Sequence, residues 1–147
     1  MNESHKSLMI LSGAILFLIG LLSGFFVEMF LNSRMGLSSH LAGIQGALFL
    51  LVIGALWQYV SLPRIFTAIT AWSIVYGMYG FWIALTLSAI WGTSEATPIA
   101  GAGYSASPWQ EAMVQAILYS ASLACLGGAV LLIEGFRRGL QRQLNQG

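Results

Sequence analysis

His40 is the residue of this sequence with the clearest potential for chemistry. A neutral imidazole in an apolar setting is a good ligand for iron or zinc, and an axial histidine is the usual protein ligand of haem. Gly43 and Ala47 follow one and two helical turns later, and such small residues leave room beside a helix for a flat group. The alternative is an interfacial histidine hydrogen-bonded to water or to Glu111. Zinc is disfavoured, because the sequence has one other histidine, His5, near the N-terminus.

Two tyrosines are the next candidates. Trp72, Tyr76, Tyr79 and Ile83 recur at intervals of four, three and four residues, which predicts one aromatic face with two hydroxyls on a helix. Such a face can line a substrate pocket or serve packing alone. Both interpretations stay open.

Glu111 is the third candidate, a carboxylate at the start of an apolar run. An ionisable group at membrane depth is costly and usually has a partner or a function. A catalytic role, a role at a helix N-terminus and a place on a polar transport path with Glu28 and Gln115 are all compatible with its position.

The composition of the sequence indicates the class of protein that positions these residues. Of 147 residues, 57% are hydrophobic and 7% are charged, and the mean hydropathy is +0.78. Soluble domains carry about 25% charged residues. Nucleic-acid binding is excluded, because it requires several phosphate-neutralising cations on one face. The single cysteine, Cys125, excludes a disulfide framework and is predicted to be a small packing residue.

Long apolar runs predict the architecture. Each is near or above the roughly 20 residues that cross a bilayer as a helix, and none alternates with the period of two expected of strands. We therefore predict an all-α, integral-membrane four-helix bundle in a single domain, residues 1–147. The predicted spans are residues 8–31, 40–62, 65–91 and 112–133.

Glycine spacing and cations refine this prediction. Gly20 and Gly24 form a GxxxG pair, a spacing that allows two helices in a membrane to approach closely. Positive residues near helix ends are retained in the cytoplasm, which predicts both termini there. Arg34 lies on the other side, and the cations on the cytoplasmic side are Lys6, Arg64, Arg137, Arg138 and Arg142.

Several segments together resemble a known family. Residues 32–43 (NSRMGLSSHLAG) look like the signature that precedes the second helix of bacterial hydroxylaminobenzene mutases. Residues 76–82 (YGMYGFW), 98–103 (PIAGAG) and 110–111 (QE) follow in that family's order. The arrangement is more distantly similar to styrene oxide isomerase, and the resemblance covers most of the chain.

This resemblance implies a multi-pass enzyme of the bacterial inner membrane. His40 would be the axial ligand of a b-type haem, with Gly43 and Ala47 beside it, in a homotrimer that holds haem near its subunit interfaces. Ferric haem would act as a Lewis acid on a small apolar aromatic substrate. The reaction would convert an aryl hydroxylamine into an aminophenol, or alternatively an aryl epoxide into an aldehyde, with Tyr76, Tyr79 and Glu111 nearby.

The sequence departs from the family pattern at three positions. An acidic residue is expected where Ala42 stands, and asparagines are expected at Gly46 and Phe81. Three hypotheses therefore stand: a haem-dependent membrane isomerase of aryl hydroxylamines or epoxides, a haem-binding or structural subunit without turnover, and a small oligomeric transporter.

Overall fold

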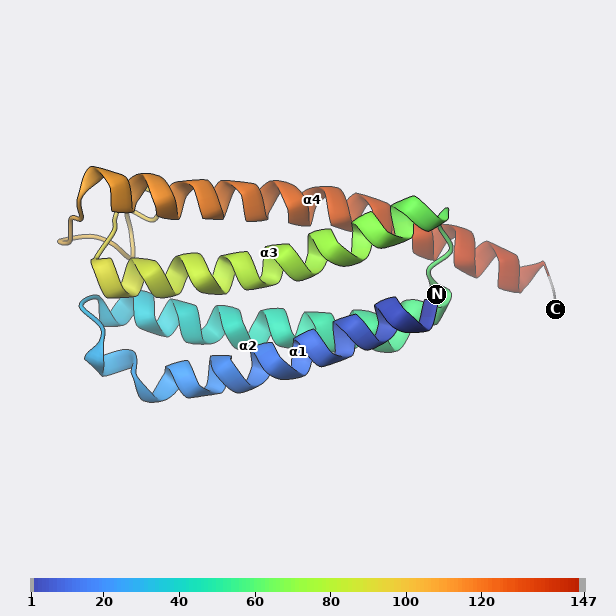
Figure 1. Ribbon diagram of the computed structural model, residues 1–147, viewed down its shortest axis with the longest axis horizontal. Coiled ribbons are helices and arrows are strands. Elements are labelled where there is room, and N and C mark those ends of the chain that lie inside the picture. The colour runs from blue at the N-terminus through green and yellow to red at the C-terminus, as the bar shows by residue number, and fades with distance from the viewer. Residues whose placement is uncertain (1, 146–147) are drawn as a thin grey trace.

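The computed structural model describes residues 2–145 and contains no strand within that range. Both ends of the chain lie at the same end of the molecule, and the last turns of α4 project beyond the other helices (Figure 1). All four long helices are long and apolar enough to cross a membrane, which confirms the predicted all-α, four-helix class. In chain order the elements are α1 (Asn2–Phe25), the 3₁₀ turn η1 (Val27–Met29), α2 (Ser33–Leu56), the 3₁₀ turn η2 (Trp57–Tyr59), α3 (Arg64–Trp91) and α4 (Pro108–Leu144).

The four helices form an open array of neighbours. α1 packs on α2, α2 on α3 and α3 on α4, as Figure 1 shows. Within residues 2–145, α4 packs on α3 and η2 without a close backbone approach to α1 or α2. In the described part of the chain the predicted bundle is therefore open, because α3 is the one long helix that contacts α4. The outer side of α4 stays apolar and exposed, at Leu123, Leu126, Val130 and Ile133, and would have to face lipid or another protein.

Glycines set the closest helix contacts. A Cβ on Gly43 would come within 2.8 Å of the Gly20 Cα, so α1 and α2 touch backbone to backbone at this point. This confirms that the Gly20–Gly24 pair marks a helix contact. On the other side of the array, a Cβ on Gly77 would lie 2.1 Å from the Cys125 Sγ. Cys125 is thus a packing residue between α3 and α4, as predicted.

The predicted ends of the first two helices are wrong by several residues. α1 ends at Phe25 and is followed by η1, whereas the apolar run extends to residue 31. α2 begins at Ser33, because the Asn32 side chain caps it by accepting a hydrogen bond from the Met35 N–H at 3.2 Å. His40 therefore lies two turns inside α2 and does not open the helix.

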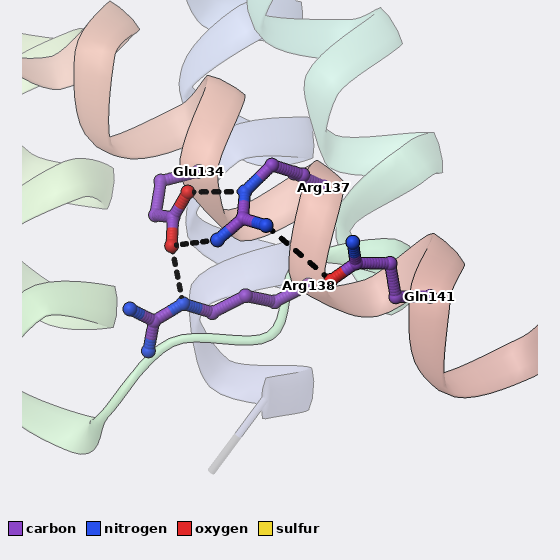
Figure 2. Close-up of polar contacts among 4 residues, drawn as sticks. All are labelled: Glu134, Arg137, Arg138 and Gln141. Atoms are coloured by element: carbon purple, nitrogen blue, oxygen red, sulfur yellow. Dashed lines mark hydrogen bonds and ion pairs between the residues drawn. The ribbon is translucent and has the colours of Figure 1, made fainter. Parts of the chain in front are cut away.

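α4 also continues beyond its predicted end at residue 133. Its charged residues pair with one another along one helix face, as Figure 2 shows. Glu134 accepts hydrogen bonds from Arg137 Nε at 2.7 Å and from Arg138 Nε at 2.5 Å. Such pairs three and four residues apart stabilise a helix. The predicted span ends at residue 133 because Glu134 is the first charged residue after the apolar run, whereas the helix continues to Leu144.

Candidate functional site

His40 is held against α1 at the Gly20–Gly24 pair. Its imidazole lies over Gly24, where a Cβ would come within 2.7 Å of Cε1 and Nδ1. Nδ1 is 2.8 Å from the Gly20 carbonyl oxygen. A carbonyl only accepts, so Nδ1 carries the proton and donates, and the lone pair of the neutral ring is on Nε2. A hydrogen bond of this kind fixes the tautomer of metal-binding histidines.

An open groove runs beside this imidazole. It has a volume of about 410 Å³ and is lined by Leu21, Gly24, Phe25 and His40. Its walls are apolar apart from the imidazole of His40. No group of three His, Cys, Asp or Glu side chains that could hold a metal ion occurs among the residues described. Haem brings its own four equatorial nitrogens and needs an axial protein ligand, so these residues fit haem.

The space predicted beside Gly43 and Ala47 is filled by the protein itself. A Cβ on Gly43 would meet Gly20 and also lie 2.9 Å from Trp82 Cδ1. Ala47 is fully buried in the core shared by α1, α2 and α3. The prediction that these two residues leave room for a flat group is therefore wrong. The open space beside His40 is the groove lined by Leu21, Gly24 and Phe25.

A second groove, of about 280 Å³, lies between α2 and α3. It contains all three positions at which the sequence departs from the family pattern. At 100° per residue, position 42 is 160° around α2 from His40, and position 46 is 120° away. Within one chain the second groove and the histidine therefore face different directions. The lining residues are Ala42, Gln45, Gly46, Met78, Phe81 and Leu85.

The two tyrosine hydroxyls do not share one wall. The Tyr79 hydroxyl donates to the Ser12 carbonyl on α1 at 2.9 Å. The Tyr76 hydroxyl is 2.7 Å from the Ser120 hydroxyl on α4. Both tyrosines lie on one helix, as predicted, but α3 packs between α1 and α4, so the two hydroxyls bond to different helices. Each hydroxyl ties α3 to another helix.

Glu111 is buried, with 4% of its surface exposed, and holds the loop between α3 and α4. Its carboxylate accepts hydrogen bonds from the Ser94 N–H at 2.9 Å and from the Glu95 N–H at 3.1 Å. It also lies in the first turn of α4, where a negative charge is favoured by the helix dipole. This geometry gives Glu111 a structural role at the end of the molecule opposite the chain termini.

Replacing Glu111 with alanine is expected to loosen that loop. Two backbone N–H groups would lose their acceptor, at a cost of about 1–3 kcal/mol. Thermal unfolding in detergent and limited proteolysis between residues 94 and 107 measure the effect. Glu95→Ala is the matched control and should have a smaller effect, because the hydrogen bond that the Glu95 carboxylate accepts from Gln115 is exposed. Unchanged stability together with lost activity would instead make Glu111 catalytic.

The structure does not assemble the polar path considered for transport. Gln115 donates to Glu95 at 2.7 Å, so it supports the same loop as Glu111. Glu28 lies in η1, which packs on α1 and α2. Among the described residues, η1 makes no comparable approach to α4. The three side chains therefore do not line one path within a single chain.

Asn32 and Arg34 are organising residues that the sequence reasoning left out of the site. The fully buried Asn32 donates from Nδ2 to the Ala100 carbonyl at 2.9 Å, besides capping α2. Arg34 donates to the Ala102 carbonyl and lies over the Tyr104 ring. The signature segment therefore clamps the α3–α4 loop over the end of α2. An asparagine directly before a helix is a capping signal, and this signal could have identified Asn32 from the sequence.

Comparison with known proteins identifies the family. The family model described as styrene oxide isomerase matches residues 5–137. Hydroxylaminobenzene mutase HabA of Ectopseudomonas oleovorans is 35% identical over 128 residues, covering 86% of this chain and 95% of HabA. Hydroxylaminobenzene mutase HabB of the same organism is 38% identical over 132 residues, covering 89% of this chain and 80% of HabB. No solved structure matches the chain.

These matches confirm the resemblance found in the sequence motifs, and with it the prediction that the chain is an isomerase. The matched residues include α2 with His40, the tyrosines of α3 and the start of α4 with Glu111. The chain belongs to the styrene oxide isomerase family.

Proposed function

We propose that this protein is a membrane isomerase that converts a small aryl hydroxylamine into an aminophenol. In that reaction a hydroxyl group moves from nitrogen to a ring carbon, so the atoms balance without a co-reactant. The observation that carries the proposal is the setting of His40, whose Nε2 lone pair is left available beside an apolar groove. The names of the mutase relatives support the substrate class.

The second candidate reaction is the opening of an aryl epoxide to an aldehyde at the same site. The groove between α2 and α3 favours it, because Ala42, Gly46 and Phe81 replace polar residues and leave Gln45 as the one polar side chain among the lining residues. The epoxide is also the less polar substrate. The name of the family model supports this reaction class too.

Haem b is the proposed cofactor, and the His40 imidazole would hold it. Leu21 and Phe25 would flank it, and the Gly20 carbonyl would hold the imidazole in the ligating tautomer. When bound, ferric haem supplies a Lewis acid that polarises a substrate oxygen. The chain itself orients the imidazole and excludes water from the groove with apolar side chains.

The protein is proposed to span the bacterial inner membrane with both termini in the cytoplasm. Five of the six lysines and arginines lie in the half of the molecule that contains the termini, whereas Arg34 lies at the other end. This distribution follows the positive-inside rule. Fusion of a cytoplasm-dependent reporter to either terminus tests the orientation.

A homotrimer is the proposed assembly. His40 and the second groove lie on different flanks of α2, so a site that uses both needs a second copy of the chain. Gln45 supports this assembly, since it is an exposed amide near the middle of an apolar helix. Polar side chains in membranes usually face protein. The mass of the detergent-solubilised protein measures the oligomeric state.

Turnover of two substrates by the purified protein tests the proposed function. N-phenylhydroxylamine and styrene oxide are offered separately to protein expressed with haem available. Aminophenol from the first substrate supports the mutase reaction, and phenylacetaldehyde from the second supports the epoxide reaction. A folded, haem-loaded protein that converts neither would instead be a binding subunit without turnover.

Introducing an amide into the second groove is expected to favour the hydroxylamine. Phe81→Asn would add a hydrogen bond to the N–OH group, which raises kcat/KM for N-phenylhydroxylamine relative to styrene oxide by about tenfold. Phe81→Leu is the control for lost aromatic volume. Position 46 is less suitable, because a Cβ there would lie 3.3 Å from Leu16 and from Met78. Equal ratios for both variants would contradict a substrate role for this groove.

A further inference from the structure

A polar pocket lies at the end of the molecule that carries the chain termini, far along the helices from His40. Its volume is about 270 Å³. Three separate segments supply its basic side chains: His5 from α1, Arg64 from the start of α3, and Arg142 from the projecting part of α4. The remaining lining residues are Val60, Ser61, Leu62 and Thr67. The pocket plays no part in the proposed isomerase site.

Close backbone packing brings Arg142 to this pocket. Gly139 lies against η2 so tightly that a Cβ would be 1.7 Å from the Tyr59 carbonyl oxygen. The Ser61 N–H donates to the Gly135 carbonyl at 3.0 Å, which joins α4 to the segment before α3. Arg142 follows these glycines by three and seven residues and therefore shares their helix face.

The basic side chains of the pocket have no carboxylate partner in the described part of the chain. At this end of the molecule, Glu3 pairs with Lys6 at 3.6 Å, and Glu134 pairs with Arg137 and Arg138. Figure 2 shows this second group gathered around the Glu134 carboxylate. Arg64 and Arg142 make no ion pair within residues 2–145. Among the residues described, nothing therefore neutralises their positive charge at the pocket.

The first turn of α3 adds hydrogen-bond donors. Pro63 precedes the helix and provides no side-chain cap. The first backbone hydrogen bond of α3 runs from the Thr67 N–H to the Pro63 carbonyl, so the N–H groups of Arg64, Ile65 and Phe66 have no acceptor within the helix. Helix N-termini of this kind favour phosphate. The His5 ring is oriented by an edge-on contact with the buried Trp57, at 6.3 Å between centroids.

We propose that this pocket binds a phosphate group, and that its occupant is the headgroup phosphate of an anionic phospholipid. Two guanidinium groups and a helix N-terminus match the charge and the acceptor geometry of phosphate. Ile65 and Phe66, which follow Arg64, are exposed apolar residues on the outside of α3. Acyl chains attached to a bound headgroup would lie along them, which favours a lipid over a soluble phosphate.

The experiment is a lipid titration of the full-length, delipidated protein in detergent, followed by native mass spectrometry. Dioleoylphosphatidylglycerol is the probe, with dioleoylphosphatidylcholine and inorganic phosphate as parallel arms. Arg64→Gln and Arg142→Gln are each expected to weaken phosphatidylglycerol binding about tenfold, as for the loss of one charge-assisted contact. Arg137→Gln is the matched control, because Arg137 is paired with Glu134 on another face of the same helix.

The outcomes separate the possible occupants. Weakening in the two pocket variants alone, without competition by inorganic phosphate, supports the lipid headgroup. Competition by inorganic phosphate at low concentration would overturn the lipid assignment in favour of a soluble phosphate compound. Equal binding by all variants, or equal loss in the Arg137→Gln control, would overturn the pocket itself. Helical content by circular dichroism confirms that each variant is folded.

Discussion

Replacing His40 with alanine is expected to abolish haem binding while the protein still folds and inserts. Under the proposed function, the imidazole would supply the ligating nitrogen in the groove that it lines with Leu21, Gly24 and Phe25. We expect haem occupancy to fall by about 100-fold or more, because removal of a metal ligand costs at least as much as loss of its supporting shell. Turnover of either aromatic substrate should fall with it. The absorption spectrum and a pyridine haemochrome assay give the haem content per chain.

Two controls make this result specific to ligation. His5→Ala removes the other histidine, which lies at the opposite end of α1 from the Gly20–Gly24 pair, and should leave haem content unchanged. Added imidazole should restore part of the haem spectrum in His40→Ala, because it can occupy the vacated space over Gly24. A normal Soret band in a folded His40→Ala protein would exclude His40 as the ligand.

The sequence predicted the helices but not where they begin and end. Low charge and long apolar runs indicate side chains that lie in apolar surroundings, and for this reason the sequence predicts the four helices. Helix ends depend on caps and local pairs instead. Asn32 starts α2 eight residues before His40, and Glu134 with its arginines carries α4 on to Leu144.

The candidate site could be predicted only in part, because it too depends on contacts between helices. The chemistry of His40 follows from its residue type, and its closeness to α1 follows from the glycine pair. Which side of His40 is open depends on what the neighbouring helices fill, so Gly43 and Ala47 were misassigned. Tyr76 and Tyr79 share a helical spacing, but helices on either side of α3 accept their hydroxyls. Single-helix arithmetic carries no information about such partners.

Glycine positions show most directly how tertiary packing shapes the site. Gly20 allows α1 to touch α2, which places its carbonyl within reach of the His40 Nδ1. Gly24 then leaves the volume that the imidazole occupies. If the imidazole needs this volume to ligate haem, adding one methyl group should damage the site while leaving every polar residue in place.

Gly24→Ala is accordingly expected to lower haem affinity by about 10- to 100-fold, the range associated with disturbing the support of a metal ligand. The new Cβ would lie 2.7 Å from Cε1 and Nδ1 of His40, too close for the ring to stay, and the Nδ1 bond to Gly20 would break. Haem titration of the apoprotein, followed in the Soret region, measures the change. Helix propensity alone predicts a more stable protein, since alanine stabilises a helix by about 1 kcal/mol relative to glycine.

Gly127→Ala is the matched control for that propensity, because a Cβ at Gly127 in α4 would meet nothing within 4 Å. It should be as stable as the wild type or slightly more so, with unchanged haem affinity. If Gly24→Ala and Gly127→Ala bound haem equally well, the ring would not need the volume over Gly24, and the ligating geometry proposed for His40 would be wrong. A loss confined to Gly24→Ala would tie haem binding to the contact between α1 and α2.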